Sequence, residues 1–296
     1  MTDARADVGV LPGTRLDGRY RLHRIHLRAG DFAVWKASDD LLNRTVAVQV
    51  FDAAPGPPVD VFDAVRTASR VAHVGLPQVF DANQDADPPY FVREWIPGRD
   101  LAAVVADGPL EPHRAARDFL LVSETLATAH AAGLPHLRLT PRSLVWSSLG
   151  GVKVVGLGVE AAAAHARVDD PELVDTRALA GLLCVALSGR CRSGDIVVRP
   201  SWSRATRAWW VCNVGTGRDL IALARRTMSA NTHRADAIRT PAQLEGELRR
   251  LSSASGVGYE ASFPRLERAD TVDQRVVEIQ HHQRHHNPPT QARPRT

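Results

Sequence analysis

The chain contains 296 residues with a formal net charge of +4, and 44% of its residues are hydrophobic. This length accommodates one large domain or two ordinary ones, and we expect a single two-lobed unit. The positive charge is carried almost entirely by arginine, without interleaved aromatic residues or a helix-turn-helix signature, so nucleic acid is not an expected partner. The three cysteines form no Cys-x-x-Cys pair, and their odd number argues against a disulfide framework.

Short segments in the first hundred residues are candidate strands. They are residues 18–22 (Gly-Arg-Tyr-Arg-Leu), residues 46–50 (Val-Ala-Val-Gln-Val) and the segment that follows residues 71–73. Residues 89–101 read Pro-Tyr-Phe-Val-Arg-Glu-Trp-Ile-Pro-Gly-Arg-Asp-Leu. We expect this stretch to connect the strand-rich part of the chain to a helical part.

Apolar spacing predicts helices in the second part of the chain. One helix carries Phe119, Leu120, Val122, Leu126 and His130, and another carries Leu220, Ile221, Leu223 and Ala224. Thr240 followed by Pro241 is typical of a capped helix start, because threonine caps free backbone N–H groups and proline fits the first helical position. This last helix is expected to end near Leu251.

The order of these segments resembles a small bacterial Ser/Thr protein kinase domain. Residues 46–50 stand where such kinases have a Val-Ala-x-Lys strand, and residues 89–101 resemble the kinase hinge. Residues 136–144 (His-Leu-Arg-Leu-Thr-Pro-Arg-Ser-Leu) stand where kinases have His-Arg-Asp-Leu-Lys-Pro-x-Asn. Residues 156–158 (Gly-Leu-Gly) stand in the place of Asp-Phe-Gly. Asp175 resembles the buried aspartate that starts the long central helix of the large lobe.

The resemblance covers about residues 13–252 and implies an α+β, bilobal protein kinase-like fold with a degenerate active site. The expected parts are an N-terminal extension (1–12), a small β-rich N-lobe (13–96), a helical C-lobe (97–252) and a flexible tail (253–296).

Kinase catalysis depends on positioning and on charges supplied by metal ions, by a lysine and by a residue that orients the accepting hydroxyl. The resemblance places other residue types at each of these positions. Gln49 replaces the lysine, Ala64 the glutamate that pairs with it, Arg138 the catalytic aspartate, Ser143 one metal ligand and Gly156 the other. The expectation is therefore a pseudokinase that is not an enzyme, with no catalytic residue, no cofactor and no metal.

The nucleotide site is also expected to be blocked. Where kinases carry three glycines that let backbone amides approach phosphates, this chain has Leu27, Ala29 and Phe32, and Phe32 is expected to fold inward. Arg93 stands at the apolar gatekeeper position, and it is expected to reach an acid or carbonyl within the cleft or to snorkel out of it. Two alternatives remain open, namely a shifted loop register that preserves a nucleotide site and a surface position for Arg93.

The C-terminal tail carries a candidate phosphosite, Thr271, between Asp270 and Asp273. Phosphorylation adds nearly two negative charges and three acceptor oxygens, which suit an arginine-lined phosphothreonine reader. An unmodified, solvated threonine is the alternative. The histidine-rich residues 281–286 suit a basic segment near a membrane or acidic surface, or a soluble linker, better than a specific metal site.

With these degraded motifs and this tail, the chain resembles the cytoplasmic pseudokinase segments of actinobacterial MviN-type lipid II flippases. The resemblance implies a scaffold in peptidoglycan and cell-wall synthesis, in which an upstream Ser/Thr kinase modifies Thr271 and a forkhead-associated (FHA) domain protein binds it. The expected location is the cytoplasm, or the cytoplasmic face of the inner membrane if the chain is part of a membrane protein. The alternatives are a divergent nucleotide-binding kinase-like enzyme and a constitutive, phosphorylation-independent interaction module.

Overall fold

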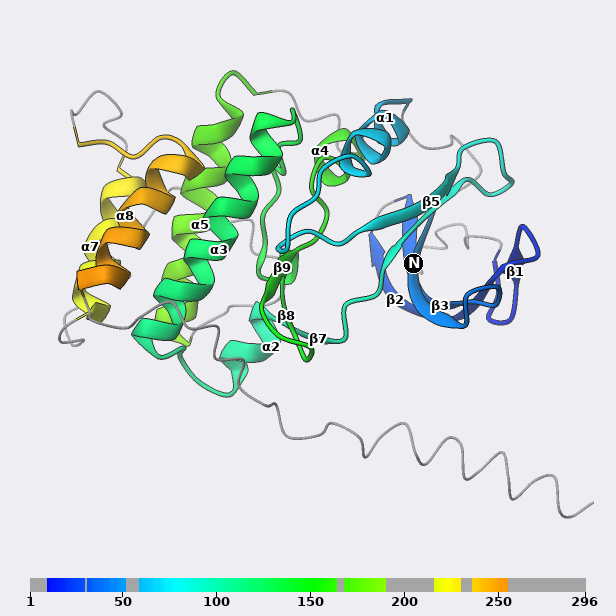
Figure 1. The fold of residues 1–296 in the computed structure, drawn as a ribbon, viewed down its shortest axis with the longest axis horizontal. Helices are drawn as coiled ribbons and strands as arrows, with labels where there is room; N and C mark the ends of the chain where they lie inside the picture. Colours follow the sequence, from blue (N-terminus) through cyan, green and yellow to red (C-terminus); the bar gives the residue numbers. More distant parts are fainter. Residues whose placement is uncertain are drawn as a thin grey trace, which may run out of the picture. The chain divides into compact units, whose positions relative to one another are not determined.

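The computed structural model describes residues 10–29, 31–51, 59–163, 168–189, 216–229 and 236–254 (Figure 1). All of them belong to one compact unit, Met1–Ala261. The candidate phosphosite Thr271 and the histidine-rich residues 281–286 lie outside the described residues.

An antiparallel sheet of six strands forms the small lobe, in the order β1-β2-β3-β4-β6-β5 (Figure 1). The strands are β1 (Arg15–Leu16), β2 (Tyr20–Ala29), β3 (Phe32–Asp39), β4 (Arg44–Phe51), β5 (Val79–Asn83) and β6 (Tyr90–Glu94). Alternate side chains of the sheet point to opposite faces. One face packs around Trp35 and Tyr20, and on the other face Phe51 packs against Phe62 of helix α1 (Val59–Ala68).

The large lobe combines a small sheet with helices. Its elements in chain order are β7 (Gly98–Asp100), α2 (Leu101–Ala106), α3 (Pro112–Ala131), η1 (Pro141–Ser143), β8 (Leu144–Ser147), β9 (Val152–Val154), α4 (Val159–Ala163), α5 (Pro171–Ser188), α7 (Thr216–Thr227) and α8 (Pro241–Ala254). Leu101, Phe119, Leu126, Leu182 and Leu248 are fully buried in one apolar core that joins α2, α3, α5 and α8. No helix in the described ranges is long and apolar enough to cross a membrane.

The helices expected at residues 119–130, 220–224 and 241–251 are present as α3, α7 and α8. The Thr240 hydroxyl accepts a hydrogen bond from the backbone N–H of Gln243 at 3.2 Å, which is the expected cap. The central helix differs from the prediction, because α5 begins at Pro171 and not at Asp175. The carboxylate of Asp170 caps it by accepting from the backbone N–H of Leu173, so Asp175 lies in the second turn.

The chain crosses from the six-stranded sheet to the three-stranded sheet of β7, β8 and β9 between Glu94 and Gly98. Gly98 pairs with Ser147 of β8 at this crossing. A Cβ atom on Gly98 would lie 2.0 Å from the backbone carbonyl oxygen of Trp146. Because the contact is with backbone, no side-chain rotation relieves it, and the close approach of the two strands requires glycine here.

We expect Gly98→Ala to destabilise the protein by about 1–3 kcal/mol, as measured by urea unfolding, because the added methyl group forces β7 away from β8. Gly246→Ala is the matched control. Gly246 lies within α8 and a Cβ there meets nothing within 4 Å, so alanine is expected to stabilise the helix by about 0.5–1 kcal/mol. Equal effects of the two substitutions would contradict the steric explanation.

Candidate functional site in the cleft between the lobes

Asp175 fixes the backbone of the loop that leads into the cleft. Its buried carboxylate accepts hydrogen bonds from the backbone N–H groups of His136 and Leu137, both at 2.7 Å, and from Nε2 of His130 at 2.9 Å. Leu137 has a φ of 60°, a left-handed conformation that is uncommon for leucine. The carboxylate therefore holds together a loop conformation that the local sequence does not favour.

His136 connects this loop to the segment after β9. Its Nε2 lies 2.9 Å from the carbonyl oxygen of Val155, and its Nδ1 accepts from the backbone N–H of Arg138 at 3.3 Å. These partners require a neutral ring that carries its proton on Nε2. Through this ring, the loop and the Gly156 region keep a fixed relative position.

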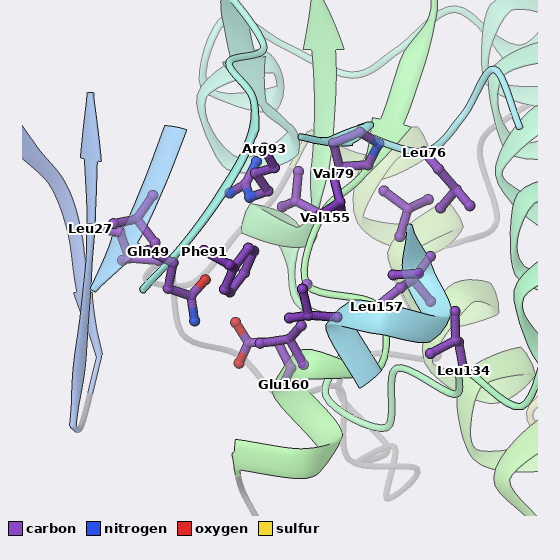
Figure 2. Close-up of a pocket in the computed structure, with 17 residues that line it drawn as sticks. Leu27, Gln49, Leu76, Val79, Phe91, Arg93, Leu134, Val155, Leu157 and Glu160 are labelled. Atoms are coloured by element: carbon purple, nitrogen blue, oxygen red, sulfur yellow. The ribbon is translucent and has the colours of Figure 1, made fainter. Parts of the chain in front are cut away.

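The structure brings together only some of the residues that the resemblance singled out. Gln49 of β4, Gly156, Leu27 of β2 and Arg93 of β6 line one cavity between the lobes, whereas other members of the set do not line it (Figure 2). The remaining members are Ala64 on α1, Arg138 on the loop before η1, Ser143 at the end of η1, Ala29 at the end of β2 and Phe32 at the start of β3.

Three of these residues have evident structural roles. The Ser143 hydroxyl accepts from the backbone N–H of Thr140 at 3.1 Å, which closes the turn at η1. The ring of Phe32 is buried against Phe51, with centroids 6.0 Å apart. Gly156 has a φ of +93°, and a Cβ on it would lie 2.6 Å from Cγ of Glu160. A side chain at residue 156 therefore requires Glu160 to move.

At the two positions that the resemblance gives as metal ligands, the Ser143 hydroxyl is engaged by the loop, and Gly156 has no side chain and lies against Glu160. Within the described part of the chain, no group of three or more His, Cys, Asp or Glu residues is placed to hold a metal ion.

Arg93 lines the interlobe cavity and is half-buried (Figure 2). Burial lowers the pKa of its guanidinium to about 10, while the charges of Glu160 and Glu94 act in the opposite direction. Among the described residues, its hydrogen bonding is limited to a 3.5 Å contact with the carbonyl oxygen of Glu94, which is at the outer limit for such a bond. Arg93 is thus a poorly paired cation in a largely apolar cavity.

A second cation, Lys153 of β9, ties the large lobe to the small one. Its Nζ donates to the carboxylate of Glu94 at 2.7 Å and to the carbonyl oxygen of Leu76 at 3.2 Å. Sequence reasoning missed this contact, which joins residues 59 positions apart. The available signal was that Lys153 is one of only two lysines in the chain.

Beside the segment that joins the two lobes, His26 of β2 contacts Trp95 edge to face, with ring centroids 5.0 Å apart. Partial burial lowers the pKa of His26, and the charges of Arg93, Arg24 and Arg142 lower it further against the opposing effect of Asp100. Arginines from β2, β6 and η1 therefore lie close enough to His26 to influence its pKa. No sequence motif indicated that these three arginines lie near one imidazole.

No protein-family model matches the chain. Over 150 residues it is 34% identical to the probable serine/threonine-protein kinase PknB of Corynebacterium glutamicum, covering 48% of this chain and 23% of that protein. Over 172 residues it is 31% identical to the serine/threonine-protein kinase PknA of Mycobacterium tuberculosis, covering 55% of this chain and 40% of that protein. The kinase domain of M. tuberculosis PknI matches with a TM-score of 0.63 and 17% identity, over 82% of this chain and 100% of that domain. The chain is related to bacterial Ser/Thr protein kinases and has their fold.

These comparisons confirm the expected bilobal, kinase-like fold. They contradict the expectation that the chain is not an enzyme, because the relatives are named as Ser/Thr protein kinases. That expectation rested on single positions in the motifs, and the relationship extends over about half of the chain. Since the matched segments make up less than half of these relatives, their activities are a basis for proposals about this chain.

We expect Asp175→Ala to cost at least about 3 kcal/mol in the free energy of unfolding, because it leaves two buried backbone N–H groups and His130 without their acceptor. Asp63→Ala is the control, since Asp63 is exposed and paired only with Arg66 at the surface of α1 among the described contacts, so its loss is expected to cost less than about 1 kcal/mol. Chemical unfolding followed by circular dichroism measures both. A loss below about 1 kcal/mol for Asp175→Ala would contradict the role assigned to this carboxylate.

Proposed function

We propose that the chain is a divergent, nucleotide-binding, kinase-like enzyme in which arginine side chains supply the positive charge at the phosphates. The observation that carries this proposal is that Arg24, Arg93 and Arg142 all lie close enough to His26 to lower its pKa, and that Arg93 also lines the interlobe cavity. Clefts lined by one sign of charge concentrate ligands of the opposite sign. Protein kinases, the class to which the relatives belong, use a nucleoside triphosphate as the phosphate donor.

Arginine is a suitable substitute for a metal ion in this setting. Phosphoryl transfer proceeds through a loose transition state whose charge lies on the equatorial oxygens, so catalysis is mainly positioning and charge stabilisation. The planar guanidinium forms paired hydrogen bonds with phosphate and stays charged at neutral pH. Arg138 and Arg142 are exposed on the loop segment that Asp175 and His136 hold in place.

The cleft must open before a nucleotide can enter. The cavity between the lobes has a volume of about 80 Å³, compared with about 300–1,000 Å³ for typical pockets that hold drug-sized ligands. Nucleotide binding on this proposal therefore requires the elements that line this cavity to move apart.

A thermal-shift titration with ATP tests the binding. We expect a dose-dependent rise in Tm that persists in EDTA, because the charges are supplied by side chains, and that weakens with added salt. The double variant Arg24→Ala/Arg142→Ala is expected to lose most of the shift, and Arg66→Ala, an exposed arginine on α1, is the control. Incubation with γ-labelled ATP in the same samples tests the transfer. Absence of any shift would refute nucleotide binding, and a shift without labelled product would refute the enzymatic part.

We also propose a second function for the C-terminal tail, where Thr271 lies between Asp270 and Asp273. A phosphothreonine in this sequence setting suits an FHA-domain reader after modification by an upstream Ser/Thr kinase. The resemblance to flippase-associated pseudokinase segments connects such a complex with cell-wall synthesis. This proposal is independent of nucleotide binding in the cleft.

Treatment with a bacterial Ser/Thr kinase followed by an FHA-domain pulldown tests this second function. Binding is expected only after phosphorylation and is expected to be lost in Thr271→Ala, because the reader's arginines need the phosphate. Thr290→Ala is the matched control within the same tail. Unchanged capture of Thr271→Ala would place the phosphosite elsewhere.

A further inference from the structure

Two opposite charges line the interlobe cavity without pairing with each other. Arg93 enters it from β6 and Glu160 from α4, and they lie on opposite sides of it (Figure 2). Neither an ion pair nor a hydrogen bond joins these two described side chains. They are close enough for the charge of Glu160 to raise the pKa of Arg93 against the effect of burial.

An unpartnered hydrogen-bond donor lies in the same cavity. Gln49 of β4 is only 5% exposed, and its Nε2 has no hydrogen-bond partner within the described residues. Its amide group is directed toward Glu160, and the ring of Phe91 lies between Glu160 and Arg93 in this view (Figure 2). Buried amide donors are nearly always satisfied in native proteins, so an unpaired one facing a cavity points to a ligand or to water.

The rest of the cavity wall is mainly apolar. Its apolar lining includes Leu27, Val34, Val65, Val79, Phe91 and Leu134. An apolar wall strengthens the electrostatic interactions of the groups within it, and it makes unpaired charges costly. The volume of about 80 Å³ limits an occupant to a few non-hydrogen atoms or a small number of water molecules.

We propose that this cavity binds a small zwitterion of the amino-acid class. Its carboxylate pairs with the guanidinium of Arg93, its ammonium group pairs with the carboxylate of Glu160, and Gln49 donates to a ligand oxygen. A simple anion pairs with Arg93 alone and a simple cation with Glu160 alone, whereas a zwitterion pairs with both charged side chains. Arg93 and the cavity are common to this proposal and to the nucleotide proposal, but Glu160 and Gln49 belong to the zwitterion site alone, and Arg24 and Arg142 belong to the nucleotide proposal alone.

Saturation-transfer NMR on the full chain tests the site with glycine, L-alanine and β-alanine as probes. Acetate and ethylammonium at equal ionic strength are the single-charge controls. We expect saturable binding of at least one zwitterion and at least tenfold weaker binding of both controls. Millimolar probe concentrations avoid the general stabilisation that osmolytes produce at high concentration.

Substitutions of Arg93 and Glu160 distinguish a ligand-binding role of these two side chains from a purely structural role. Arg93→Met and Glu160→Gln are each expected to weaken zwitterion binding at least tenfold, while the surface substitution Arg66→Met leaves it unchanged. Without ligand, Arg93→Met is expected to raise Tm, because it removes a poorly paired buried charge. ATP-induced shifts in Glu160→Gln are expected to persist, which distinguishes this site from the nucleotide proposal.

The proposal fails if none of the three zwitterions shows saturable binding, which would mean that the cavity holds water only. It also fails if acetate binds as well as the zwitterions, or if Arg93→Met and Glu160→Gln bind them with unchanged affinity. Glu160→Gln keeps the test valid should Arg93→Met fold poorly, because Glu160 is partly exposed on a short helix.

Discussion

The carboxylate of Asp175 is the constraint on which the interior of the large lobe depends. It organises two consecutive backbone N–H groups, and so it fixes the loop that carries His136 and Arg138. The His136 ring in turn contacts the carbonyl oxygen of Val155, so the loop also positions the segment beside the cavity. A charge buried in this way is stable only when its acceptor capacity is used, which ties the central helix to the loop as one unit.

The fold of the chain and the groups that line its cleft support different conclusions. The fold is that of bacterial kinase domains, and the loop beside the cleft is held by hydrogen bonds to Asp175. Kinases use acids to hold metal ions, and the cavity of this chain is lined by one acid, Glu160, which lies against Gly156, and by one arginine, Arg93. A shared fold does not by itself fix the chemistry of a site.

Much of the fold followed from the sequence, because motif order and helical spacing are local signals. The start of α5 was missed although Asp170 and Pro171 form a recognisable cap and first helical residue. The site was less accessible to prediction. Pairings such as Lys153 with Glu94, or the proximity of Glu160 to Arg93, join residues whose distance is set by the packed backbone. The inference that the chain is not an enzyme failed for a related reason, since it weighed isolated positions against a relationship that extends over half of the chain.

The tie between Lys153, Glu94 and Leu76 has a kinetic consequence for the cleft. It joins β9 of the large lobe to the end of β6 and to the segment before β5, so these contacts oppose any separation of the elements that line the cavity. Entry of any ligand then waits for a breathing motion that breaks at least one of these contacts. Association rates are expected to be set by the frequency of this opening and to level off as ligand concentration rises. Slow exchange of a ligand then reflects the rate at which these contacts break more than the affinity of the site.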